Sequence, residues 1–180
     1  MTNIPDKVMI KARKMSSIFL EVASYYEFDD IYHKIMKPHF GENWFAVLLG
    51  GIAFRESHFG LLLINGLGDS GHGHGIMQID DRSHGEWIRN HNWRDPATNI
   101  EYGADVWLED LEFFDLHGDL VDHDTIKEIW AATAAFNCGA GNVRRALRAG
   151  RDVDHYTTGK NYSADIRSIM VYLRSQRWPT

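Results

Sequence analysis

A glycine-rich segment interrupts an otherwise helical sequence, and this feature constrains the fold most. Residues 61–81 contain five glycines, and Gly75-Ile76-Met77-Gln78-Ile79 alternates like a short strand. The apolar residues on both sides of this segment repeat at helical spacing instead. We therefore predict a mainly α fold of the α+β type, with one small β-hairpin region near residues 61–81.

The first half of the chain shows three helical patterns. Apolar residues recur once per turn over residues 8–23, and again in a shorter stretch from Phe28 to Met36. The second helix should end near Pro38, because proline lacks the N–H that a helix interior needs. A third and better defined helix covers residues 45–56.

Helical spacing returns after the glycine-rich segment. Asp95 is a plausible cap, with Pro96 at the first helical position. Thr125-Ile126-Lys127-Glu128 matches a capping box and should open a helix that ends before Gly139. The predicted inward face of that helix consists of Ile126, Ile129, Trp130, Thr133 and Asn137. Two further helices are expected over residues 142–148 and 162–173.

Glu56 lies on the same face as the apolar residues of the third helix. Phe45, Leu48, Leu49 and Ile52 precede it at helical spacing, and Glu56 falls in the last turn. Apolar surroundings and the negative end of a helix both raise a carboxyl pKa. An exposed glutamate in the last turn of a helix, without a catalytic role, is the common alternative. The position of Glu56 on the apolar face of this helix favours a catalytic role.

Asp69 and Asp80 lie on the glycine-rich segment that follows Glu56. Each alone could be a turn former beside glycines. Together with Glu56, and with Gln78 between them, they suggest an acid in apolar surroundings that faces ionised carboxylates. That combination is the equipment for cleaving a glycosidic bond.

Other polar residues carry weaker signals. A zinc site could be suggested by His72, His74 and His84 together with Asp69. These histidines are not spaced i, i+4 on a helix, however, and no cysteine accompanies them as a ligand. The sequence favours solvated loop histidines, and we predict no metal and no cofactor. Cys138 is interpreted as a small buried residue at a helix end. The segment 136–142 is either a plain turn between helices or a place where glycines let a ligand approach the backbone.

Composition limits the class of protein. The chain has 180 residues, 44% hydrophobic residues and a net charge of -6, which indicates a single monomeric domain over residues 1–180. The negative charge argues against nucleic acid, and no apolar run is long enough for stable membrane insertion. One cysteine allows no intramolecular disulfide, as expected of synthesis in a reducing compartment. Charged residues near the N-terminus argue against a secretory signal.

Several motifs follow one another in register along the chain. These motifs are Arg55-Glu56-Ser57-His58, Gly68-Asp69 with Gly73 and Gly75, Met77-Gln78-Ile79-Asp80, Arg82-Ser83-His84, Phe136-Asn137 with Gly139-Ala140-Gly141-Asn142-Val143, and Tyr162 with Asp165. Together they resemble goose-type lysozymes, which belong with the soluble lytic transglycosylase superfamily. The resemblance runs from about Trp44 to Asp165. Residues 1–40 are less family-like, and residues 41–180 are the expected catalytic core.

The resemblance implies a lysozyme-like fold and a muramidase that cleaves the β-1,4 bond between N-acetylmuramic acid and N-acetylglucosamine in peptidoglycan. Glu56 is then the general acid, while Asp69 and Asp80 position and activate water, which gives inversion. The residues expected to bind the sugars are Gln78, His84, Phe136, Asn137 and Tyr162.

The sequence departs from the family pattern in three places. Phe136 replaces a usual tyrosine, so a hydroxyl near the acid is expected to be missing. His74 stands where an apolar aromatic residue is common, and residues 28–40 are expected to be an insertion. These departures leave substrate preference open.

Two other functions stay open at this point. A lytic transglycosylase would form 1,6-anhydro ends and would not need the two aspartates, and a non-catalytic glycan-binding module would keep the cleft alone. For the location, we expect a phage endolysin that is made in the cytoplasm and reaches periplasmic peptidoglycan after holin-type release. A tail-associated enzyme or an injected effector is the alternative.

Overall fold

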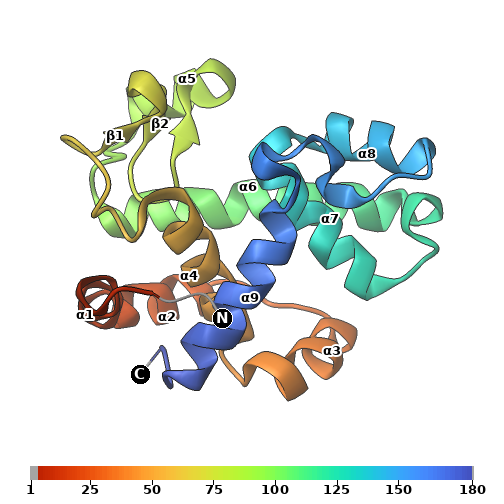
Figure 1. Cartoon of the computed structure of the whole chain (residues 1–180), viewed down its shortest axis with the longest axis horizontal. Coiled ribbons are helices and arrows are strands. Elements are labelled where there is room, and N and C mark those ends of the chain that lie inside the picture. The colour runs from red at the N-terminus through yellow and green to blue at the C-terminus, as the bar shows by residue number, and fades with distance from the viewer. Residues whose placement is uncertain (1–3, 180) are drawn as a thin grey trace.

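Helices dominate the computed structural model, which describes residues 4–179 (Figure 1). The helices in chain order are α1 (Asp6–Lys14), α2 (Ser16–Ala23), α3 (Asp30–Phe40), α4 (Trp44–Ser57), α5 (Asp81–Asn90), α6 (Pro96–Leu116), α7 (Thr125–Cys138), α8 (Ala140–Arg148) and α9 (Tyr162–Ser175). The strands are β1 (Leu67–Gly68), β2 (Gly73–His74) and β3 (Ile79–Asp80). The predicted mainly α fold with a small β region is confirmed. Within the described residues, no helix has the length and apolar character needed to cross a membrane.

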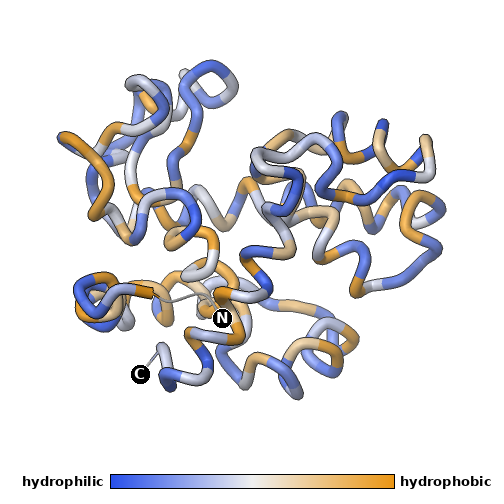
Figure 2. The backbone as a smooth tube through the Cα atoms, viewed as in Figure 1, coloured by the Kyte–Doolittle hydropathy of each residue, from blue (hydrophilic) through white to orange (hydrophobic). Residues whose placement is uncertain are grey.

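Helix α4 lies in the middle of the core. All its residues from Trp44 to Phe54 are buried, and α2, α3, α6 and α9 pack around it. Figure 2 shows apolar stretches along α4 and the helices that border it. A Cβ on Gly50 would lie 2.3 Å from the ring of Trp178, so glycine permits this close packing. The apolar environment of α4 thus extends around the whole helix and does not form a single stripe.

The three strands form an antiparallel sheet in the order β1-β2-β3. Gly68 pairs with Gly73, and Gly73 pairs in turn with Asp80 on the other side. The register therefore places the segment that carries Asp69 and the strand that carries Asp80 on opposite sides of β2. Such a short sheet needs support from neighbouring elements, because two-residue strands provide few ladder hydrogen bonds.

Helices α6 and α4 supply that support. The buried Asn99 side chain of α6 accepts a hydrogen bond from the Met77 amide at 2.8 Å and donates one to the His74 carbonyl at 3.1 Å. At the end of α4, the Ser57 hydroxyl donates to the Ile76 carbonyl at 2.7 Å. Residues 75–78 are consequently a turn between β2 and β3.

The strand-like alternation over residues 75–79 is therefore misleading for residues 75–78, whereas Ile79 does begin β3. Gly75 and Gln78 have φ angles of +72° and +51°, which an extended strand does not allow. A Cβ on Gly75 would also lie 2.4 Å from Asn99, so this position needs glycine for two reasons. Ile76 and Met77 are apolar because they are buried in the core, and apolar residues at these positions resemble the sequence pattern of a strand.

Two predicted helix boundaries differ from the structure. Helix α3 continues through Pro38 and ends before Gly41, whose φ is +84°. The burial of Met36 and Phe40 on both sides of Pro38 offsets the one lost hydrogen bond. The start of α3 at Asp30 is also two residues later than expected.

The predicted capping box at Thr125 is also wrong, because the cap of α7 is Asp124. Its carboxylate accepts hydrogen bonds from the amides of Ile126 and Lys127. Glu128 is instead buried beside Tyr32. Ile126 was expected on the inward face, but it is 44% exposed in this first turn. The predicted cap at Asp95 is confirmed, since its carboxylate accepts from the Thr98 amide at 2.9 Å.

The histidines of the glycine-rich segment do not share one environment. His72 is half-exposed and pairs with Asp81 at 2.9 Å, as expected of a loop histidine. His74 is buried and packs edge-on against Trp93, with ring centroids 4.7 Å apart. The prediction that all these histidines are solvated is therefore wrong for His74.

We predict that Asn99→Ala lowers the free energy of unfolding by about 2–4 kcal/mol, because it leaves the Met77 amide and the His74 carbonyl buried without partners. Chemical denaturation monitored by circular dichroism measures this change. The matched control is Asn90→Ala, an exposed position in α5, which should change the free energy by less than about 0.5 kcal/mol. Equal effects of the two substitutions would contradict the supporting role of Asn99.

Candidate active site

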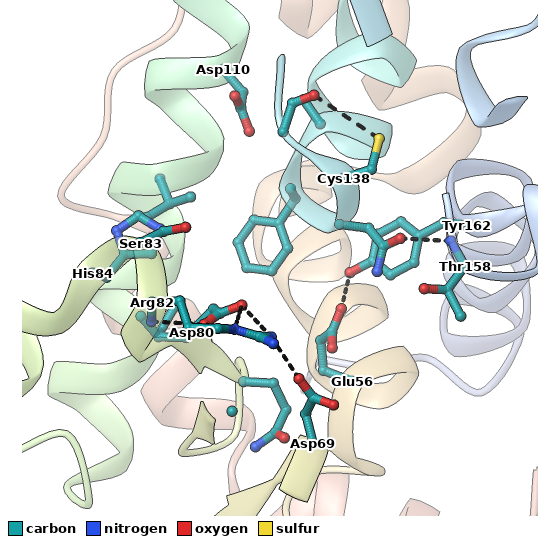
Figure 3. A pocket seen from close by; sticks show the side chains of 18 of the residues that line it. Glu56, Asp69, Asp80, Arg82, Ser83, His84, Asp110, Cys138, Thr158 and Tyr162 are labelled. Carbon is teal, nitrogen blue, oxygen red and sulfur yellow. Dashed lines mark hydrogen bonds and ion pairs between the residues drawn. The ribbon is translucent and has the colours of Figure 1, made fainter. Parts of the chain in front are cut away.

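A cleft of about 780 Å³ lies between the sheet with α5 on one side and the ends of α7 and α9 on the other (Figure 3). Residues of α4 and α6 complete its wall. The structure places every predicted site residue on this wall: Glu56, Asp69, Gln78, Asp80, His84, Phe136, Asn137 and Tyr162. Segments more than 100 residues apart in the sequence thus meet at one cavity, and the roles of these residues stay predictions.

Glu56 lies in the last turn of α4, directly before the chain reverses. His58 and Phe59 adopt left-handed φ angles of +50° and +57°, so the helix cannot continue beyond them. The side chain of Glu56 lines the cleft. Burial raises the pKa of Glu56 to about 7, although a hydrogen bond from Tyr162 and the charge of Arg55 act in the opposite direction. Near neutral pH a large fraction of Glu56 therefore carries a proton that it can donate.

The Tyr162 hydroxyl donates a hydrogen bond to Oε1 of Glu56. Tyr162 is itself buried at the start of α9, and the Arg55 guanidinium lies 5.5 Å from its ring centroid. The expected loss of a hydroxyl at Phe136 thus does not leave Glu56 without a hydroxyl partner. The structure thus shows Tyr162 in contact with Glu56, and the sugar contact expected of Tyr162 stays a prediction.

The start of α9 is held in place by Asp154. Its buried carboxylate accepts hydrogen bonds from the Ser163 amide at 2.9 Å and the Ser163 hydroxyl at 2.7 Å. It also accepts from the Ala164 amide at 3.2 Å and from the Thr157 hydroxyl at 3.1 Å. This network fixes the first turn of the helix and, with it, the position of Tyr162.

Arg82 joins the two aspartates across the cleft from Glu56. One of its terminal nitrogens lies 2.7 Å from Oδ2 of Asp69 and 2.7 Å from Oδ2 of Asp80. Its Nε donates to both oxygens of Asp80, at 2.9 and 3.0 Å. These hydrogen bonds hold the pKa of Asp80 below its usual range. The site therefore combines a protonatable acid with carboxylates that are paired with a cation.

Gln78 lies over the sheet, and its position explains two of the glycines. Its Nε2 donates to the Gly75 carbonyl at 2.7 Å. A Cβ on Gly68 or on Gly73 would lie only 2.0 or 2.3 Å from its Oε1. The absence of side chains at these two glycines is what allows Gln78 to lie over β1 and β2.

The end of α7 contributes Phe136 and Asn137 to the opposite wall. Oδ1 of Asn137 accepts a hydrogen bond from the Thr158 amide at 2.8 Å, which fixes the amide plane. Among the described residues, none accepts from its Nδ2, so this group can donate to a ligand in the cleft. Phe136 is half-buried beside it and offers an aromatic face.

His84 lies near the other end of the wall and is held by Tyr102. Its Nδ1 is 3.0 Å from the Tyr102 hydroxyl, and Tyr102 stacks on Trp87 with ring centroids 4.0 Å apart. Burial lowers the pKa of His84, so the ring is neutral near pH 7. A neutral imidazole can accept or donate a hydrogen bond to a sugar hydroxyl.

Three residues of the cleft wall have contacts or environments that the sequence did not suggest. Arg82 was part of a motif, but only its position two residues after Asp80 could have indicated an ion pair. Arg55 supports Tyr162 and lies 3.4 Å from Asp165. Asp110 on α6 gave no signal, and burial together with the charge of Glu109 raises its pKa to about 7.

Cys138 lies on the cleft wall, half-buried rather than fully buried. Burial raises the pKa of its thiol to about 11, so the thiol stays protonated near neutral pH and is a poor nucleophile. Within residues 4–179, no group of three or more histidine, cysteine or carboxylate side chains has an arrangement that could hold a metal ion.

Comparison with known proteins agrees with this geometry. A family model described as lysozyme g matches residues 32–176. The chain belongs to the lysozyme g family. The match begins inside the segment 1–40 that was expected to be less family-like, and it covers the whole cleft.

Individual lysozyme g proteins show the same relationship. Lysozyme G of Dromaius novaehollandiae is 31% identical over 130 residues, which cover 71% of this chain and 57% of the relative. Lysozyme g of Gallus gallus is 30% identical over 71% of this chain and 56% of the relative. Lysozyme g of Takifugu rubripes is 33% identical over 66% of this chain and 60% of the relative. The matched part thus spans somewhat more than half the length of these relatives.

We predict that Tyr162→Phe raises the pKa of Glu56 above its value of about 7. The hydrogen bond from the hydroxyl stabilises the carboxylate, so its removal favours the protonated form. The carbon-13 chemical shift of the Glu56 carboxyl, followed against pH, measures the change. Tyr172→Phe on the same helix is the control and should leave the titration unchanged. A lower pKa in Tyr162→Phe would show that the hydroxyl does not donate to Glu56.

Proposed function

We propose that this protein is a peptidoglycan muramidase that hydrolyses the β-1,4 bond between N-acetylmuramic acid and N-acetylglucosamine with inversion. The observation that carries the proposal is the pairing, across one cleft, of a carboxyl with a raised pKa and two carboxylates joined by Arg82. This is the arrangement that inverting glycosidases need, because one group must donate a proton while another accepts one. The names of the lysozyme g relatives support the same class of reaction.

Glu56 is the general acid in this proposal. Its proton passes to the glycosidic oxygen as the bond from that oxygen to the anomeric carbon breaks, so the leaving sugar departs as a neutral alcohol. The Tyr162 hydrogen bond then stabilises the carboxylate that forms on Glu56. A proton from solvent restores the acid for the next cycle.

Asp69 receives the proton of the attacking water. Its Oδ2 contacts Arg82, whereas no described residue donates a hydrogen bond to its Oδ1. Both oxygens of Asp80, in contrast, accept hydrogen bonds from Arg82, which weakens Asp80 as a base. Asp80 therefore acts mainly by holding Arg82, and through it Asp69, in place. The water attacks the anomeric carbon from the side opposite to the leaving oxygen, and this attack inverts the configuration.

The sugar rings pack along the wall between the two carboxyl clusters. We assign Gln78, His84, Phe136 and Asn137 to this contact, since all four line the cleft. Nδ2 of Asn137 is suited to an N-acetyl carbonyl, because it can donate and its amide plane is fixed by Thr158. No cofactor takes part, and a single chain carries every group that the reaction needs.

A lytic transglycosylase is the second candidate, because one acid such as Glu56 is sufficient for that reaction. The muramic C6 hydroxyl would then replace water and leave a 1,6-anhydro end. The Asp69–Arg82–Asp80 cluster favours hydrolysis, because a transglycosylase has no water to activate.

We predict that the protein releases muropeptides with hydrated, reducible muramic ends from purified peptidoglycan, as measured by mass spectrometry. Glu56→Gln should lower the release roughly 10²–10⁴-fold, the usual contribution of a general acid. Activity should also fall as pH rises through about 7, because the acid then loses its proton. Glu86→Gln, at an exposed position of α5, is the control and should behave like wild type.

The remaining outcomes of this measurement are also informative. Anhydro ends would make the protein a lytic transglycosylase and would leave Asp69 and Asp80 with a structural role. No release by the wild-type protein would favour a glycan-binding module. In the hydrolase, Asp69→Asn should reduce release more than Asp80→Asn, since only Asp69 has a free oxygen.

We further propose a role in bacterial cell lysis of the phage endolysin type, with synthesis in the cytoplasm. The single cysteine supports folding in a reducing compartment. Expression in a bacterium with thin peptidoglycan should cause lysis only when a holin opens the inner membrane, as followed by the optical density of the culture. Lysis without the holin would contradict this route, and Glu56→Gln with the holin controls for membrane damage alone.

A further inference from the structure

An exposed apolar loop lies between α4 and β1, outside the cleft. Leu61, Leu62 and Ile64 of this loop are 43%, 62% and 80% exposed, and none of the three lines the cleft. Figure 2 shows the loop as an apolar segment that protrudes at the left, above α1. Single exposed apolar side chains are normal on a protein surface, but three within four residues form a patch that needs a reason.

The backbone holds this loop in one shape. The Leu62 amide donates a hydrogen bond to the Ser57 carbonyl at 3.1 Å. Ile64 and Leu67 exchange two backbone hydrogen bonds, at 3.0 and 3.3 Å, across the tight turn at Asn65-Gly66. The loop therefore presents its aliphatic side chains to solvent in a fixed arrangement, and a partner that covers them has little backbone to order.

Two cations border the loop. Lys11 of α1 and Arg94 line a pocket of about 340 Å³ together with Leu61 and Leu63. The Arg94 guanidinium lies over the ring of Trp93, 3.9 Å from its centroid. Neither cation forms an ion pair with a carboxylate of residues 4–179. Their charges are therefore available to an anionic partner.

The exposed face of α1 extends this cationic surface. Lys7, Ile10, Lys11 and Lys14 fall at i, i+3, i+4 and i+7 and so share one face of the helix. Ile10 is 58% exposed, and neither Lys7 nor Lys14 is ion-paired within the described part of the chain. The nine residues of α1 include four cations and one carboxylate, although the whole chain has a net charge of -6. Positive charge and exposed aliphatic side chains thus occur on the same surface.

We propose that the loop 61–64, this face of α1 and Arg94 together dock the protein onto a bilayer that contains anionic phospholipids. The aliphatic side chains enter the boundary between headgroups and acyl chains, while the cations contact the lipid phosphates. An anionic polymer would also attract the cations, but it would leave the aliphatic loop in water, so the loop favours a bilayer. The contact is peripheral and leaves the cleft accessible, because none of these residues lines it.

Cosedimentation with lipid vesicles tests the proposal. The protein should bind vesicles made of equal parts phosphatidylglycerol and phosphatidylethanolamine, and it should not bind vesicles of phosphatidylcholine alone. Leu62→Ser combined with Ile64→Ser should weaken binding to the anionic vesicles at least about tenfold, because two aliphatic side chains no longer leave water. Lys11→Gln combined with Arg94→Gln should also weaken it about tenfold and reduce its sensitivity to salt.

Matched controls come from other surfaces of the protein. Leu116→Ser, 73% exposed at the far end of α6, and Lys34→Gln, exposed on α3, should leave vesicle binding unchanged. An unchanged circular dichroism spectrum shows that each variant is folded. Ile64→Ser alone keeps the test available if the double variant is unfolded.

Three results would overturn the proposal. The first is a wild-type protein that binds neither kind of vesicle. The second is binding that depends on Lys11 and Arg94 but not on Leu62 and Ile64, which would assign the surface to an anionic polymer. The third is self-association, measured by analytical ultracentrifugation, that is lost in the Leu62→Ser, Ile64→Ser protein while vesicles are not bound. That result would assign the loop to a second copy of the chain.

Discussion

The hydrogen bond between Tyr162 and Glu56 joins the two helices on which the site depends. Helix α4 brings the carboxyl into an apolar core, and burial raises its pKa to about 7. Burial alone would raise it further, and the Tyr162 hydroxyl limits the shift by stabilising the carboxylate. Asp154 fixes the start of α9 and therefore the hydroxyl. The acidity of Glu56 thus depends on a cap of a helix that begins more than 100 residues later.

The opposite wall of the cleft brings two acidic side chains close to one arginine. Asp69 and Asp80 both lie within contact distance of Arg82, whose positive charge offsets the repulsion between two acidic side chains. The sheet sets the spacing of the two aspartates, because β2 lies between β1, which Asp69 follows, and β3, which carries Asp80. Three short strands are sufficient for this task because Asn99 and Ser57 fix their turn to α6 and α4.

The sequence predicted the helices and the members of the cleft well, but not the contacts between them. Glu56 was placed by an apolar stripe, although α4 is buried on all sides and the stripe therefore does not select a face. The turn at residues 75–78 resembled a strand because Asn99, a distant residue, determines its shape. An ion pair between residues close together in the sequence, such as Asp80 and Arg82, can be predicted from the sequence. The hydrogen bond from Tyr162 to Glu56 and the raised pKa of Asp110 both depend on tertiary packing, so no local sequence pattern indicates them.

Burial raises the pKa of two carboxyls on the cleft wall, Glu56 and Asp110, to about 7. Only Glu56 accepts a hydrogen bond from another described residue, the Tyr162 hydroxyl. This hydrogen bond fixes the orientation of the Glu56 carboxyl and stabilises its ionised form, whereas no described side chain orients Asp110 in the same way. A raised pKa alone therefore does not distinguish Glu56 from Asp110, but the contact with Tyr162 does.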